Sequence, residues 1–219
     1  VLVRVDADAN HLDASTQSPY LIATSEVGDD PRLLDLLLAH GANLRAKDSY
    51  NGTGLIRAAD RGFPVIVARL LDAGIEIDHV NRLGWTALHE AVVLGNGSRR
   101  YQQVVRLLVD AGADPLLPTQ RDGIRPRTHA QERGYTRIDA ILKEASVGLT
   151  ANERLLRHAS AGSVVAAEAA LADGADLEAR DAKGRTALLL AATEDRVPMA
   201  EMLVARGADV DALDGRHDT

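Results

Sequence analysis

The chain has 219 residues, of which 46% are apolar but only 3% are aromatic, so its core must be built mainly from alanine, leucine and valine. It contains no cysteine, which excludes disulfide frameworks and thiolate metal sites. A formal net charge of −7 disfavours general binding to nucleic acid or anionic membranes, and no apolar run approaches the roughly 18 residues of a membrane span.

In chain order, the sequence forms a series of similar units, each with a turn, a short helix, a loop and a longer helix that ends at a glycine. The first two predicted units lie at 18–41 and 53–74. The third, at 81–115, is the clearest, because Thr86 is suited to cap its first helix and Gly112 follows its second. We therefore predict helix pairs separated by turns.

The remaining units are less regular. The third unit carries about five extra residues around Gly95–Gln103 relative to the repeat length, which predicts a longer loop between its helices. The unit at 120–145 has Arg127 where an apolar residue is expected. Because a buried arginine would be costly, we expect an end-cap repeat with one hydrated face. Two further units follow at 152–177 and 181–211.

Equivalent residues of these units recur 33 positions apart. The pairs are Gly41 and Gly74, Gly174 and Gly207, and Thr53 and Thr86. A fixed period of this length predicts a solenoid, in which each unit buries its apolar face only by stacking on its neighbours. We predict an all-α solenoid of about six helix-turn-helix repeats with hairpin-like turns, and a structural role for these glycines and for Gly112.

The first helices carry a recognisable motif. Residues 86–91 read Thr-Ala-Leu-His-Glu-Ala, residues 186–191 keep the Thr, Leu and Ala of that pattern, and Gly-Ala-Asp follows several second helices. The chain resembles the ankyrin-repeat family, and in particular its bacterial members. The resemblance implies hairpin tips that project to one side and protein binding along a concave face. It also implies that Thr86 and His89 are structural, with the His89 ring bonding the Thr86 hydroxyl and nearby turn backbone.

The search for reactive groups identifies no catalytic residue, metal site or cofactor site. No histidine pair has the i, i+4 spacing of a helical zinc motif, and neither a glycine-rich phosphate loop nor a nucleophile elbow is present. Carboxylate pairs such as Asp176 with Glu178 and Asp209 with Asp211 recur at one phase of the repeat. We interpret them as turn residues and predict that the protein is not an enzyme.

Transferring the family's contact positions to this chain predicts a partner-binding face on the hairpin tips and first helices. Its residues are Tyr50, Arg61, Arg82, Leu83, Trp85, Val93, Arg121, Ile124 and Arg133. Trp85 has two interpretations. It is either an interface anchor, because Trp and Arg dominate binding hot spots, or a packing residue that contacts Tyr50 or Ile124 of a neighbouring hairpin.

A second hypothesis is a small-ligand site or an atypical active site. It would use a groove between the 95–103 loop and the 121–133 tips, with Arg121, Arg125, His129 and Tyr101 as its polar groups. The same end of the chain is rich in arginine, which favours either an acidic partner or phosphate, or else a solvated cap. The arginines are Arg99, Arg100, Arg121, Arg125, Arg127, Arg133 and Arg137.

The repeats fall into two blocks, 1–145 and 146–219. Val1-Leu2-Val3 is interpreted as the tail of a helix, so the first block begins with a partial repeat, and Thr219 matches Thr186. One hypothesis places 146–219 before 1–145 in the physical stack, with roughly 15 residues between them by the repeat period. The alternative is a truncated fragment with a degenerate repeat at 146–180.

The expected partner is another protein, with no nucleic acid, membrane or cofactor. We expect a monomer, or weak self-association through the open ends of the repeat array. A chain without cysteine suits any redox compartment, so its composition does not fix the localisation. We favour the cytoplasm, and the periplasm and secretion stay compatible with the sequence.

Overall fold

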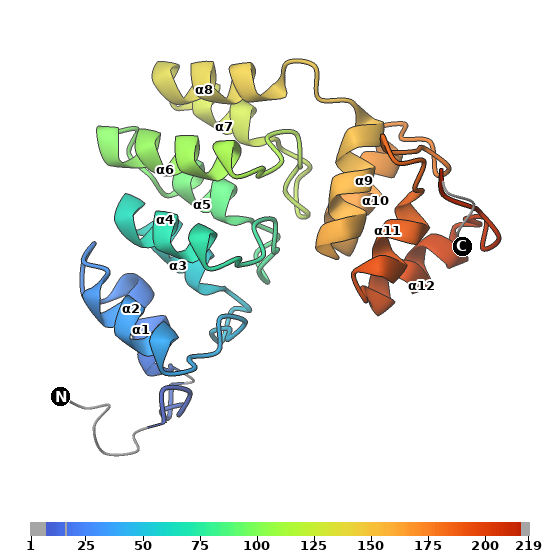
Figure 1. The fold of residues 1–219 in the computed structure, drawn as a ribbon. Helices are drawn as coiled ribbons and strands as arrows, with labels where there is room; N and C mark the ends of the chain where they lie inside the picture. The colour runs from blue at the N-terminus through green and yellow to red at the C-terminus, as the bar shows by residue number, and fades with distance from the viewer. Residues whose placement is uncertain (1–7, 16, 216–219) are drawn as a thin grey trace. The chain divides into compact units, whose positions relative to one another are not determined.

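The computed structural model describes residues 8–15 and 17–215 of the chain (Figure 1). The chain divides into two compact units, residues 1–145 and 146–219, which we call unit 1 and unit 2. The described residues form helices and turns, and their one strand-like pairing is an antiparallel bridge between Lys47 and Thr53. The all-α fold is confirmed. The predicted helix tail at 1–3 and the match at Thr219 lie outside the described residues.

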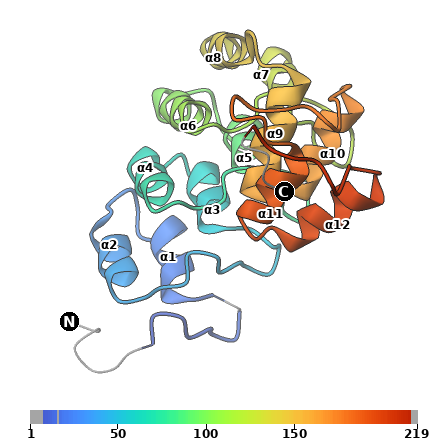
Figure 2. The same cartoon turned by 45° about the vertical axis from the view of Figure 1, so that its right-hand side comes forward.

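Unit 1 contains four helix pairs within its described residues. They are α1 (Pro19–Ser25) with α2 (Arg32–Ala39), α3 (Gly54–Asp60) with α4 (Pro64–Asp72), α5 (Ala87–Val93) with α6 (Arg99–Asp110), and α7 (Pro126–Glu132) with α8 (Thr136–Ser146). The first helices pack in series, α1 on α3, α3 on α5 and α5 on α7, and α4 packs on α6 in the second layer (Figures 1 and 2). This is the expected solenoid arrangement.

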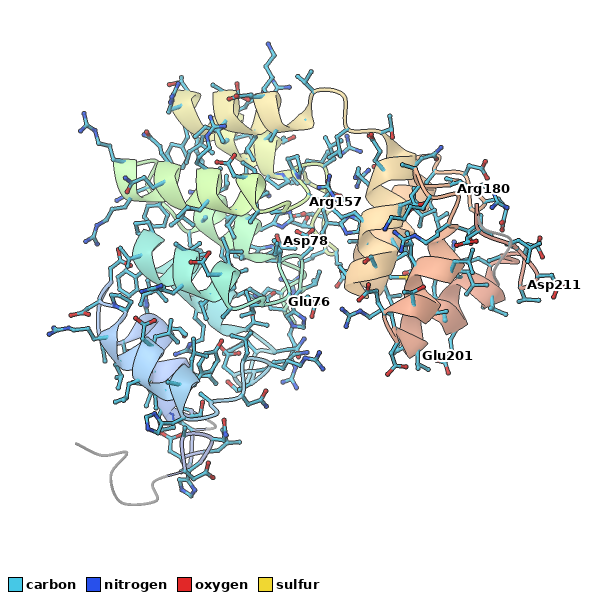
Figure 3. The ribbon with its side chains drawn as sticks, viewed as in Figure 1. Glu76, Asp78, Arg157, Arg180, Glu201 and Asp211 are labelled. Carbon is cyan, nitrogen blue, oxygen red and sulfur yellow. The ribbon has the colours of Figure 1, made fainter. Side chains whose placement is uncertain are left out.

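Unit 2 contains two further helix pairs. They are α9 (Ala151–Ala161) with α10 (Val164–Ala172), and α11 (Ala187–Thr193) with α12 (Val197–Ala205). Helix α9 packs on α11, and α10 on α12. Successive hairpins are also joined, because Arg180 donates from Nη1 to the carbonyls of Gly184 at 2.7 Å and Leu213 at 2.5 Å. Figure 3 labels Arg180 and Asp211 on these two hairpin segments and Glu201 on α12.

Five of the described helices begin at a residue whose side chain caps them. Side chains of five N-cap residues accept a backbone N–H of the first turn, which satisfies a donor that has no partner within the helix. These residues are Ser18, Thr53, Thr86, Thr150 and Thr186. Glycines with left-handed backbone follow the second helices and end them. They are Gly41, Gly74, Gly112, Gly174 and Gly207.

Small side chains let the first helices of unit 1 approach closely. Ala58, Ala59, Ala87, Ala91 and Ala130 all have no exposed surface. Larger residues fill the space between the layers, and the fully buried ones include Tyr20, Leu55, Leu70, Leu88 and Leu108. A core of small residues explains how a chain with few aromatic residues encloses a continuous apolar interior.

Tyrosines connect consecutive repeats at the starts of the second helices. Tyr101 donates from its hydroxyl to the carbonyl of Asp60 at 2.8 Å, and Tyr135 donates to the carbonyl of Gly95 at 2.9 Å. Tyr101 lies in α6 and bonds to the last residue of α3, whereas Tyr135 directly precedes α8 and bonds just beyond the end of α5. These bonds satisfy carbonyls that have no partner within the short helices.

The expected long loop at Gly95–Gln103 is wrong, because α6 already begins at Arg99. Helix α6 has 12 residues, whereas α4 has nine, so the insertion lengthens the helix. The Tyr101 ring packs where Cβ atoms on Gly62 and Gly95 would lie within 3 Å of it. Arginine and glutamine favour helix, and the two glycines leave the space that the ring needs.

The last pair of unit 1 is only partly covered. Helix α7 buries Pro126 and Ala130, and Arg127 is half-buried, with its Nε donating to Asp139 at 2.8 Å. The arginine is therefore paired on its own repeat. The relative order of the two blocks in the physical stack stays a prediction.

We predict that Gly54→Ala destabilises unit 1 by about 1–3 kcal/mol through overpacking. A Cβ at this position would lie 2.5 Å from the Tyr20 hydroxyl and 2.9 Å from Cγ2 of Thr24, and Tyr20 is fully buried. Urea denaturation measures the change. The loss is expected to shrink in a Tyr20→Phe background, and an equal loss there would show that contact with the hydroxyl is not the cause.

Candidate protein-binding face

The hairpin tips are shaped by an acceptor side chain that stands five residues before a helix-capping threonine. Asn81 accepts at Oδ1 from the N–H groups of Leu83 at 2.9 Å and Trp85 at 3.1 Å. Asp48 accepts in the same way from Tyr50 and Gly52 at 2.9 and 2.8 Å. Such Asx turns set the tip backbone without help from a partner.

These acceptors were not among the predicted structural residues, although the sequence carries a signal for them. Asp48 and Asn81 are 33 residues apart, and Asp181 stands at the same distance before its own capping threonine. Asp181 likewise accepts from Lys183 and Arg185. The turn interpretation of the recurring carboxylates also agrees with the structure, because Asp176 and Asp209 each accept the N–H two residues further along.

Consecutive tips of unit 1 are bonded to one another. The N–H of Arg82 donates to the carbonyl of Tyr50 at 2.9 Å, and its Nη1 donates to the carbonyl of Ser49 at 2.6 Å. The next tip continues the row, with the N–H of Gln120 donating to the carbonyl of Gly84 at 3.1 Å. We call residues 48–52, 81–85 and 119–124 the hairpin row.

Several predicted contact residues are exposed on the hairpin row. Tyr50 has 62% of its surface exposed and Leu83 has 38%. Arg82 and Arg121 are also exposed, whereas the predicted residues Trp85 and Ile124 are half-buried. The row therefore presents aromatic, aliphatic and cationic groups on a backbone that is already held in place.

The other predicted residues lie at the far ends of the first helices. Arg61 and Arg133 follow α3 and α7 and are exposed. Val93, at the end of α5, has only 9% of its surface exposed, because α5 is covered by α3 on one side and α7 on the other. The prediction that Val93 is exposed on the binding face is therefore wrong. The exposed apolar residue at this end of α5 is Leu94, with 52% of its surface exposed.

The predicted set thus forms two groups rather than one patch. Helix α5 has seven residues, so its two ends are about 10 Å apart. The hairpin row lies at the beginning of the first helices and the Arg61 and Arg133 group at their ends. A partner that contacts both groups must span the first-helix layer.

Thr86 and His89 fix the start of α5 beside the hairpin row. The N–H of Thr86 donates to Nδ1 of His89 at 3.2 Å, and the N–H of His89 donates back to the Thr86 hydroxyl at 3.4 Å. The ring is fully buried, and this burial, with His129 nearby, lowers the pKa of His89 to about 4. The imidazole is therefore neutral near pH 7, with Nδ1 as the acceptor in the capping arrangement.

Glu90 connects α5 to the central tip and is buried. One carboxylate oxygen accepts from Nδ2 of Asn81 at 2.7 Å, and the other has no hydrogen-bond partner within the described part of the chain. Burial, reinforced by Asp60 and more weakly by Asp48, raises the pKa of Glu90 to about 7. A carboxyl group that titrates near neutral pH therefore lies under the hairpin row.

The residues of the alternative site are separated by their structural roles. Arg121 is exposed on the hairpin row, Arg125 precedes α7 and is half-buried, and Tyr101 bonds to Asp60. His129 lies within α7, and its Nδ1 is 3.9 Å from Glu132. Because residues 99–103 are helical, the expected loop wall of this groove is part of α6.

The described residues hold no group of three histidine, aspartate or glutamate side chains placed to bind a metal ion. None of the helices that they form is long and apolar enough to cross a membrane.

Comparison with known proteins agrees with this geometry. Residues 20–119 match the family profile of ankyrin repeats in three copies, and residues 183–215 match the profile of a single ankyrin repeat. The ankyrin-repeat protein YahD of Escherichia coli K12 is 36% identical over 142 residues, which cover 64% of this chain and 69% of that protein. The chain belongs to the ankyrin-repeat family.

Solved ankyrin-repeat structures are also similar. A crystal structure of an ankyrin-repeat domain from Acinetobacter baumannii AYE has a TM-score of 0.61 and 46% identity, covering 65% of this chain and 71% of that one. The ankyrin-repeat protein EF0377 has a TM-score of 0.59 and 35% identity, covering 64% and 69%. Ankyrin repeats generally serve as protein-interaction modules and are typically non-catalytic.

We predict that Glu90→Gln removes a pH-dependent loss of stability. In the unfolded chain, Glu90 loses its proton near its ordinary pKa of 4.5, whereas the folded protein keeps that proton up to about pH 7. Folding stability therefore falls as pH rises from about 4.5 to 7, by about 3 kcal/mol. Glutamine retains the acceptor for Asn81 but cannot ionise, so the variant is expected to be more stable than the parent at pH 8.

Urea unfolding at pH 5, 6, 7 and 8 measures this effect. The exposed Asp72→Asn variant is the matched control, because it likewise neutralises a carboxylate of unit 1 that is not buried. If the free energy of unfolding of Glu90→Gln and that of the parent changed in parallel with pH, Glu90 would not keep its proton in the folded state.

Proposed function

We propose that this ankyrin-repeat chain is a non-catalytic binding module whose protein partner contacts the hairpin row and first-helix ends of unit 1. The observation that carries the proposal is the row of three bonded tips. Tyr50 and Leu83 are exposed on tips whose backbones are already bonded to each other or to an Asx acceptor. A surface that is ordered before binding loses little conformational entropy on association.

The side chains on this face suit a protein partner. Tyrosine and arginine are enriched among residues that dominate binding energy, and here Tyr50 lies beside Arg82, whose backbone N–H donates to the Tyr50 carbonyl. Arg121 extends the row, and Arg61 and Arg133 supply charge at the helix ends. We propose that apolar side chains of the partner pack near Tyr50 and Leu83, with polar or acidic groups toward the arginines.

Trp85 keeps both of its interpretations. Its backbone N–H donates to Asn81, and its side chain is half-buried, so part of the ring is available for a partner and part packs within the protein. Loss of the ring can therefore affect binding, stability or both. These two effects are separable by measurement.

We predict that Trp85→Ala weakens binding of the natural partner by about 2 kcal/mol or more while the melting temperature changes little. The partner is first identified by crosslinking and mass spectrometry in the source organism, and its affinity is then measured by calorimetry with purified proteins. Tyr50→Ala is expected to weaken binding as well. Leu36→Ala is the control that is expected to leave the affinity unchanged, because Leu36 is an apolar residue of α2 whose exposure is close to that of Leu83.

One result would decide the role of Trp85, and another would contradict the proposal itself. An unchanged affinity with a lowered melting temperature in Trp85→Ala would assign the tryptophan to packing. Equal losses in Tyr50→Ala and Leu36→Ala would show that the partner does not select the hairpin row.

A further inference from the structure

A groove of about 710 Å³ lies on the second helices of unit 1, and none of the residues assigned to partner binding lines it. Its lining residues lie on α4, α6 and α8. These are the second helices of three consecutive repeats, whose order along the chain can be followed in Figures 1 and 2. No residue of the hairpin row lines it. The groove therefore belongs to the layer of second helices, and the proposed function does not use it.

The apolar residues that line the groove, which we call its floor, come from all three helices. Val65 and Ala68 lie on α4, Leu107 on α6 and Ile141 on α8. Val65 has 44% of its surface exposed, Ala68 and Leu107 are half-buried, and Ile141 is buried beneath them at 3%. Aliphatic residues that stay partly exposed in a concavity are typical of a binding surface, since each gains free energy when a partner covers it.

The groove also carries three arginines and no acidic residue. Arg99 and Arg106 lie on α6 and Arg137 on α8, and the remaining polar lining residues are glutamines. Arg99 and Arg137 are exposed, whereas Arg106 donates to Glu144 at 2.9 Å. In a chain with 32 acidic and 25 basic side chains, this concentration of positive charge runs against the overall balance.

The combination of groups limits the kind of occupant. A polyanion such as nucleic acid would gain from the arginines but not from the aliphatic floor, and the groove has no aromatic ring on which a base could stack. The net charge of −7 would also repel a long polyanion. A segment that carries both carboxylates and aliphatic side chains complements both parts of the groove.

We propose that this groove binds a short acidic amphipathic segment of a partner protein. Its aliphatic side chains pack on Val65, Ala68 and Leu107, and its carboxylates pair with Arg99 and Arg137. An amphipathic helix meets these requirements, because residues three and four apart share one face and can enter the groove together. The chain then has two separate binding surfaces within unit 1, the hairpin row and this groove.

The test selects ligands without assuming a sequence. A phage library of random peptides of about 14 residues, which is roughly four helical turns, is selected on the full chain and counter-selected on Arg99→Glu/Arg137→Glu. We expect the enriched peptides to combine Asp or Glu with Leu, Ile or Phe at spacings of three and four. A labelled peptide from this pool is then titrated by fluorescence anisotropy.

Matched variants locate the binding site. Arg99→Gln/Arg137→Gln is expected to weaken binding of the labelled peptide at least tenfold. Arg32→Gln/Arg69→Gln removes two exposed arginines outside the groove. This variant is expected to change the affinity for the labelled peptide less than twofold. Tyr50→Ala on the hairpin row is expected to have no effect, so a failure of this proposal is distinguishable from a failure of the proposed function. Circular dichroism and the melting temperature verify that each variant folds.

Three results would overturn the proposal. The first is that no enriched peptide depends on Arg99 and Arg137. The second is that the enriched peptides lack acidic residues. The third is that heparin displaces the peptide while replacement of its leucines by serine leaves the affinity unchanged, which would indicate a general anion site. Inorganic phosphate is included as a competitor to separate binding of a single anion from binding of a peptide.

Discussion

Close packing between the alanine-rich first helices of successive repeats holds unit 1 together. The fully buried Ala58, Ala87 and Ala130 come from three consecutive first helices, and none of these helices exceeds seven residues. Helices this short are marginal alone in water, so their stability comes from the neighbours on either side. Hydrogen bonds between repeats add direction to this packing, as where Tyr101 and Tyr135 each bond to the preceding repeat.

This stacking determines where binding groups can gather. Because each repeat sits in the same relation to the last, equivalent residues form rows, and the chain can vary their side chains without altering the backbone. The hairpin row follows from this, with the N–H of Arg82 donating to the carbonyl of Tyr50 on the preceding tip. The groove on the second helices depends on stacking as well, because the residues of its floor come from α4, α6 and α8. Both surfaces depend on at least three repeats.

The sequence predicted the repeat period, the helix caps and the turn glycines well, because these depend on local chemistry. Thr86 and Gly112 act within a few residues of their own positions. The errors concern residues whose environment is decided by other repeats. The residues at 99–103 are helical, and Tyr101 among them packs on Gly62 and Gly95, while Val93 is buried because α3 and α7 cover α5. Asn81 was overlooked although its 33-residue spacing from Asp48 was visible.

By itself, the sequence determined the family, the helix-pair architecture and the expectation of a protein partner, since periodicity and capping are local and repeat along the chain. Only the tertiary structure decided which side chains stay accessible and which polar groups are buried together. Glu90 is the clearest case, because its raised pKa arises from burial and from Asp60 and Asp48, which lie far from it in the chain. Desolvation and charge proximity are properties of the packed repeats, and no single repeat contains them.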